Sequence, residues 1–131
     1  MQDRPTAPEL LDAMAAKLFG EVREWVPRER RFQVLVLANL CAVIARELRA
    51  GAEPSLADVR LFRERLGEGG PQPAPERADA VARELATELA AAIRRGALDD
   101  SLTDVVADLR EHVRRKLEIA RPGYADPKPT P

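Results

Sequence analysis

Residues 31–48, RFQVLVLANLCAVIAREL, place a run of apolar residues between arginines, with one asparagine, Asn39, near the middle. The apolar part from Val34 to Ala45 is about 12 residues long, or roughly 18 Å as a helix. The hydrocarbon core of a bilayer requires about 20 residues. The stretch is therefore too short for a membrane span, and it predicts a helix inside a soluble helical protein.

Apolar side chains cover most of the circumference of this helix, which we expect over residues 28–49. One side carries Val34, Leu37, Cys41, Ile44 and Leu48, and much of the other carries Phe32, Leu35, Val36 and Val43. A helix that is apolar on most sides is covered by other helices or by a second subunit. The sequence therefore predicts a central, largely buried second helix.

The rest of the chain shows the three- and four-residue spacing of amphipathic helices. Capping boxes at Thr6 to Glu9 and at Ser55 to Asp58 mark two helix starts, and Gly51 marks a helix end. We expect an all-α fold, an antiparallel bundle of about five helices in a single domain over residues 1–121. A Pro/Gly-rich connector at 67–75 interrupts it, and an extended Pro-rich tail follows at 122–131.

Composition excludes several classes of function. The net charge of −1 gives no field that would attract nucleic acid. The single cysteine, Cys41, excludes an intramolecular disulfide and is interpreted as a small buried hydrophobe. His112 is the only histidine, so a ferritin-like di-iron site with two histidines is impossible. We expect no metal, no cofactor and, since the first residues contain no secretory signal, a cytoplasmic location.

Asn39 is the residue whose role the sequence leaves open. A buried amide requires a hydrogen-bond partner, because burying it alone costs a few kcal/mol. The structural interpretation gives it a neighbouring helix, a loop or its own copy across a dimer axis. The functional interpretation pairs it with Arg46, seven residues further along the same side, in a polar pocket. The structural interpretation is favoured, because most buried polar groups serve to satisfy hydrogen bonds.

The last helix ends in a basic stretch, REHVRRKLEIARPGY at 110–124. Glu111 is spaced to pair with Arg115 four residues on, and His112 lies at the edge of the apolar stripe, where a structural role is usual. The stretch is interpreted first as a solvated helix face. The second interpretation is a patch for an anion or an acidic partner.

Three stretches together resemble a bacterial family of unknown function: QDRPTAPELLDAM at 2–14, FQVLVLANLCAVIARELRAG at 32–51, and VRRKLEIARPGY at 113–124. The resemblance implies a small, helical, cytoplasmic protein encoded beside aminoglycoside-phosphotransferase-like kinases and acyl-CoA dehydrogenases. It implies no mechanism. By position, the family pattern points to Arg4, Pro5, Thr6, Asn39, Arg46, Glu47, Lys116, Pro122 and Tyr124. The chain departs from the pattern at Gln33, where related sequences have histidine. This difference weakens the hypothesis that the residue at this position has a catalytic role.

Two hypotheses for function follow. The first is a non-enzymatic accessory protein, a homodimer, that binds another protein such as the neighbouring kinase or dehydrogenase. The second is a small-molecule binder or enzyme with a polar pocket formed by Asn39, Arg46, Glu47, Lys116 and Tyr124. No residue is assigned a catalytic role, and neither nucleic acid nor a membrane is expected as a partner.

Overall fold

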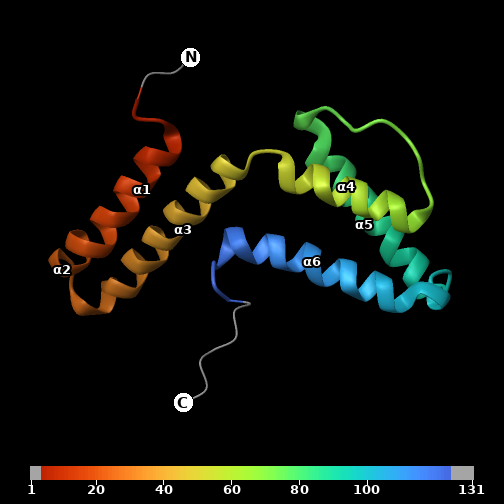
Figure 1. The fold of residues 1–131 in the computed structure, drawn as a ribbon. Coiled ribbons are helices and arrows are strands. Elements are labelled where there is room, and N and C mark those ends of the chain that lie inside the picture. Colours follow the sequence, from red (N-terminus) through yellow and green to blue (C-terminus); the bar gives the residue numbers. More distant parts are fainter. Residues whose placement is uncertain (1–3, 125–131) are drawn as a thin grey trace. The chain divides into compact units, whose positions relative to one another are not determined.

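The computed structural model describes residues 4–124, and the predicted tail from 125 onward lies outside the described residues. Over this range the chain is helical and contains no strand, so the predicted all-α class is confirmed. The helices divide into two compact units (Figure 1). The N-terminal unit comprises residues 4–51 with 119–121, and the C-terminal unit comprises 52–118 with 122–124. The predicted single bundle domain stays a prediction.

A pair of antiparallel helices forms the N-terminal unit (Figure 1). The first begins with α1 (Ala7–Lys17) and continues without a break through the π-helical η1 (Leu18–Val22) into α2 (Arg23–Trp25). The predicted capping box marks its start, where the backbone N–H of Thr6 donates to Oε2 of Glu9 at 2.7 Å. The π-helical turn surrounds Gly20, a residue with low helix propensity.

The second helix of the pair follows the short η2 (Arg28–Arg30) and is α3 (Arg31–Ala50). It ends at Gly51, as predicted, with a φ of 59° that glycine adopts without strain. Helix α3 buries only Val34, Ala38 and Ala45. The predicted extensive burial of this helix is therefore not reached in the single chain, because α1 covers one side of α3 and leaves large apolar residues elsewhere exposed.

The C-terminal unit contains α4 (Glu53–Leu66), η3 (Pro75–Arg77), α5 (Ala78–Arg94), η4 (Asp99–Ser101) and α6 (Leu102–Ala120). Helix α4 begins before the predicted cap at Ser55, so that prediction is wrong. Pro54 explains the earlier start, since its fixed φ suits the first helical turn and its missing N–H costs no hydrogen bond. Residues 68–74, within the predicted connector at 67–75, contain no helix.

The largest core lies between α4 and α5. It consists of Val59, Phe62, Ala82, Leu85 and Leu89, each at most 7% exposed. These residues recur at three- and four-residue spacing, so each helix presents one continuous stripe to the other. The side chain of Phe62 is the largest that is almost fully buried. The small residue Ala82 allows the two helices to approach closely.

None of the helices within residues 4–124 is both long enough and apolar enough to cross a bilayer. Helix α3 is 20 residues long, but charged residues occupy both of its ends. The sequence-based exclusion of a membrane span is therefore confirmed for the described part of the chain.

Candidate functional site

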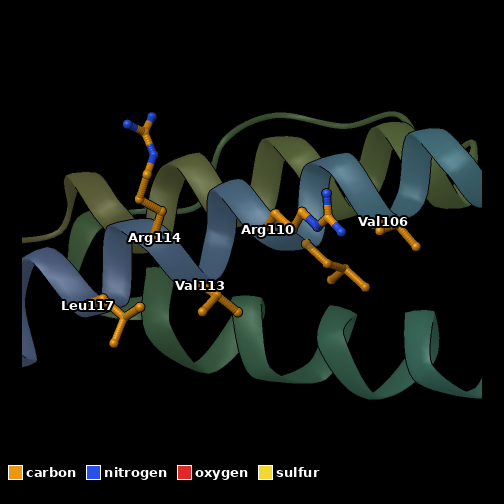
Figure 2. Close-up of a pocket in the computed structure, with 6 residues that line it drawn as sticks. Val106, Arg110, Val113, Arg114 and Leu117 are labelled. Atoms are coloured by element: carbon orange, nitrogen blue, oxygen red, sulfur yellow. The ribbon is translucent and has the colours of Figure 1, made fainter. Parts of the chain in front are cut away.

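The first candidate site is a groove of about 500 Å³ on the surface of α6. Figure 2 shows that its side chains all come from this one helix. We call this the α6 groove, and its lining residues are Val106, Leu109, Arg110, Val113, Arg114 and Leu117. Val106 and Val113 are among the exposed large hydrophobic residues of the chain. Leu117 is half-buried and Leu109 packs against buried residues of α4 and α5, so the two valines form most of the exposed part of the stripe. Neighbouring exposed apolar side chains are typical of binding surfaces.

Basic side chains flank the apolar stripe of the α6 groove. Arg114 donates two hydrogen bonds to Oε2 of Glu111, at 3.0 and 2.7 Å, and this contact raises the pKa of Arg114 above its usual value. Arg110 and Lys116 form no ion pair with another described residue. The groove therefore combines an apolar floor with positive charge that is not neutralised within residues 4–124.

A second groove, of about 520 Å³, lies on one side of the α1–α3 pair. Its lining residues are Ala15, Ala16, Phe19, Leu35, Ala38, Asn39 and Ala42. Asn39 is exposed, so the expectation of a buried amide is wrong. In the N-terminal unit, α1 packs against α3 along the side that buries Val34, Ala38 and Ala45, and Asn39 lies off that side. Asn39 is the only polar side chain among the lining residues of this groove.

The structure does not bring the other predicted site residues to this groove. Arg46 donates from Nε to the carbonyl oxygen of Ile119 at 2.5 Å, and Arg46 is absent from the lining of the Asn39 groove. This contact places a cation against the last carbonyl groups of a helix, where it is favourable. Glu47, Lys116 and Tyr124 are exposed. The predicted polar pocket around all five residues stays a prediction.

One cluster of ionisable side chains, formed by Asp58, His112 and Arg115, lies between α4 and α6. Oδ1 of Asp58 is 2.7 Å from Nδ1 of His112 and 2.7 Å from Nη2 of Arg115. A carboxylate only accepts, so both nitrogens donate to it. The ring of His112 also packs against Phe62, with 5.2 Å between the ring centroids. His112 and Asp58 are mostly covered by protein, so the cluster holds the two helices together.

Sequence reasoning assigned Asp58 to a helix cap and missed its contact with α6. It identified the local pair of Glu111 and Arg115, whose charged atoms lie 3.6 Å apart. It did not identify the partner of Arg115 that is 57 residues away. One signal was available, since Asp58 directly precedes Val59 on the buried stripe of α4. A carboxylate next to a buried stripe requires a cationic partner.

The described residues contain no group of three or more side chains of the kind that holds a metal ion. His112 is turned toward Asp58 and Phe62 and is not a lining residue of the α6 groove. The two grooves are largely apolar, and their polar side chains are few. This arrangement is suited to binding an apolar or amphipathic partner.

No curated protein and no solved structure matches the chain. One family model matches residues 24–124, which include α3 to α6 and leave α1 outside the match. The first of the three stretches that carry the resemblance, at 2–14, therefore lies outside the matched range. The chain belongs to the family described as Domain of unknown function (DUF6285).

Proposed function

We propose that this protein is a non-enzymatic accessory protein that acts by binding other proteins, and that it does so as a homodimer. One observation carries the proposal. The N-terminal unit exposes an apolar face that its own residues do not cover. We call it the α1–α3 face, and it consists of Leu10, Met14, Leu37, Leu40, Ile44 and Leu48, each between 44% and 53% exposed.

Helical spacing places these six residues on one side of the α1–α3 pair. The ion pair of Arg49 with Asp12 and the groove at Asn39 mark the opposite side. The residues of the α1–α3 face follow three- and four-residue intervals along both helices. The face is therefore continuous across the two helices.

A pair of helices by itself encloses no core. In the N-terminal unit the buried residues are Val34, Ala38 and Ala45, all of them small or medium in size. Most helical stability comes from packing an amphipathic face rather than from helix propensity. A second pair of helices placed on the α1–α3 face would bury it and give a four-helix bundle, which is a common dimer architecture.

The size of the face fits such a dimer. Helix α3 has 20 residues and is about 30 Å long, and packed helices are roughly 10 Å apart. One side of the whole pair therefore measures about 30 by 20 Å, or about 600 Å², at the lower end of standard interfaces, which bury about 600–1,000 Å² per subunit. The α1–α3 face extends over about 17 Å of this length along α3, from Leu37 to Leu48. The six residues of the face carry no charge that would select an oppositely charged partner. A second copy, related by a two-fold axis, matches such a face with itself.

The first test is the mass of the protein in solution. We expect light scattering to give twice the mass of one chain. Leu37→Glu, which places a charge in the α1–α3 face, should give a monomer, because a buried unpaired carboxylate is strongly unfavourable. Val113→Glu is the matched control, since Val113 is 50% exposed and Leu37 is 52% exposed. A wild-type monomer, or a dimer that persists in Leu37→Glu, would contradict the dimer.

The resemblance to a family encoded beside kinase-like and acyl-CoA dehydrogenase genes suggests the first partners to test. We propose that the protein binds the product of one such gene. A pull-down with the full chain against both purified products tests this proposal. If neither product is retained, these partners are wrong, whatever the oligomeric state of the chain.

A second candidate function is small-molecule binding in the groove at Asn39. The combination of an apolar lining with one exposed amide supports it, because such pockets use few polar groups to orient a ligand. We expect Asn39→Leu to reduce several-fold the amount of any small molecule that co-purifies, measured by mass spectrometry of the extracted protein. Gln33→Leu, which removes another exposed amide of α3, is the control. Equal amounts from all three proteins would reject this candidate.

A further inference from the structure

We infer that the α6 groove binds an acidic amphipathic helix of a partner protein. This inference rests on the proposed protein-binding function and specifies the chemistry of the partner. It concerns a different surface from the α1–α3 face. The two surfaces lie in different units, so a variant can disturb one without the other.

The shape of the groove suits a helix. Its apolar residues Val106, Leu109, Val113 and Leu117 follow intervals of three, four and four residues along α6. A stripe with this spacing accepts the corresponding stripe of a second helix. From the first to the last of these residues the stripe extends about 17 Å. This length corresponds to three turns of a partner helix.

The charges of the groove select an acidic partner. Helical spacing places Arg110 and Arg114 on one side of the stripe and Lys116 on the other. The acidic residues of α6 occupy the opposite face of the helix, and they are Asp104, Asp108, Glu111 and Glu118. Two of them, Asp104 and Asp108, are engaged by Arg65 of α4. Glu111 pairs with Arg114, so Arg110 on one side of the stripe and Lys116 on the other are the cations that have no ion pair within residues 4–124.

Figure 2 shows that Arg114 extends away from the labelled apolar side chains Val113 and Leu117. Flanking acids on a partner helix would reach Arg110 on one side and Lys116 on the other, while the apolar residues of that helix contact the floor of the groove. Charge pairs at the rim of an interface mainly improve association rate and specificity. The apolar contacts at the centre supply most of the affinity.

A second copy of α6 fits the groove poorly. A two-fold axis would bring Arg110 and Arg114 of one copy against the same residues of the other. Like charges facing each other across an interface are unfavourable. A membrane surface is also disfavoured, since interfacial helices carry many Lys and Arg residues that anionic lipids attract. Residues 102–120 contain four basic and four acidic residues, so this helix has no net positive charge.

The test uses the full chain and two synthetic helices of about 18 residues, a length at which an isolated helix begins to be stable. Both carry leucines at i, i+3, i+7 and i+10, and one carries glutamates at the flanking positions where the other carries lysines. Fluorescence anisotropy measures the dissociation constant of each labelled peptide. We expect the glutamate peptide to bind at least roughly tenfold more tightly than the lysine peptide.

Two variants locate the binding. Val113→Glu should raise the dissociation constant of the glutamate peptide at least about tenfold, because it places a charge in the floor of the groove. Arg110→Glu should narrow or reverse the preference between the two peptides. Arg77→Glu is the control for Arg110→Glu, since Arg77 is an exposed arginine of the same unit outside the groove. Circular dichroism confirms that each variant keeps its helical content.

Three results would overturn the inference. In the first, the peptides bind equally or the groove variants leave binding unchanged. In the second, Val113→Glu converts a dimer into a monomer, which assigns the groove to a second copy. In the third, the protein binds phosphatidylglycerol vesicles through Arg110 and ignores both peptides, which assigns it to a membrane.

The variant Leu37→Glu separates this inference from the proposed function. We expect it to abolish the dimer and to leave the affinity for the glutamate peptide unchanged. Suppose that the chain forms a dimer and retains a partner in the pull-down while neither peptide binds. In that case the inference about the α6 groove is wrong and the proposed function stands. If the chain is a monomer, retains neither gene product and binds neither peptide, the proposed function is wrong as well.

Discussion

Phe62→Ala is expected to lower the free energy of unfolding of the C-terminal unit by about 3–5 kcal/mol, the cost of removing a buried aromatic ring from a core. Phe62 is 2% exposed and packs among Val59, Ala82, Leu85 and Leu89. Its ring also contacts His112. The cavity would therefore weaken both the α4–α5 core and the contact with α6. A small domain has only about 5–15 kcal/mol of stability in total, so the variant should be close to unfolding.

Thermal denaturation followed by circular dichroism measures this effect. One kcal/mol corresponds to about 4–8 °C for a domain of 60–100 residues, so the melting temperature should fall by more than about 10 °C. Phe32→Ala is the matched control, because Phe32 is 74% exposed and the same atoms are removed at the surface. We expect it to change the free energy of unfolding by at most about 0.5 kcal/mol. Equal effects of the two variants would show that Phe62 is not in the core.

Asp58→Ala is expected to have the second largest effect, a loss of about 2–3 kcal/mol in the free energy of unfolding. Asp58 is 8% exposed and accepts hydrogen bonds from His112 and Arg115. Its removal leaves the guanidinium of Arg115, which is about three-quarters covered, without this carboxylate. Breaking a fully buried ion pair costs about 3–5 kcal/mol, and the partial exposure of Arg115 reduces that figure.

Chemical denaturation in urea measures the loss. Asp79→Ala serves as the control, because Asp79 pairs with Arg83 on the surface of α5, where both side chains are more than half exposed. Exposed pairs contribute about 0–1 kcal/mol. Combining Asp58→Ala with Arg115→Met should recover part of the stability, since the unpaired charge is then gone. A double variant that is less stable than Asp58→Ala would argue against the ion pair as the cause.

The sequence predicted the helices and several of their ends. The capping box from Thr6 to Glu9, the end of α3 at Gly51 and the connector after Leu66 all rest on interactions within a few residues. Such local signals act wherever the segment lies in the fold. The prediction failed at Ser55, where Pro54 provided a competing local signal two residues into α4. The apolar stripe of α6, which lines its groove, was also visible in the sequence.

The sequence by itself thus determined an all-helical chain, the positions of most helix ends and the apolar stripes. Only the tertiary structure decided which stripes are buried. It left Asn39 exposed and most of α3 uncovered, and it brought Asp58 to His112 and Arg115, 54 and 57 residues away. The physical reason is that periodicity indicates which face of a helix is apolar but not what covers that face. Burial and long-range ion pairs depend on the packing of whole helices.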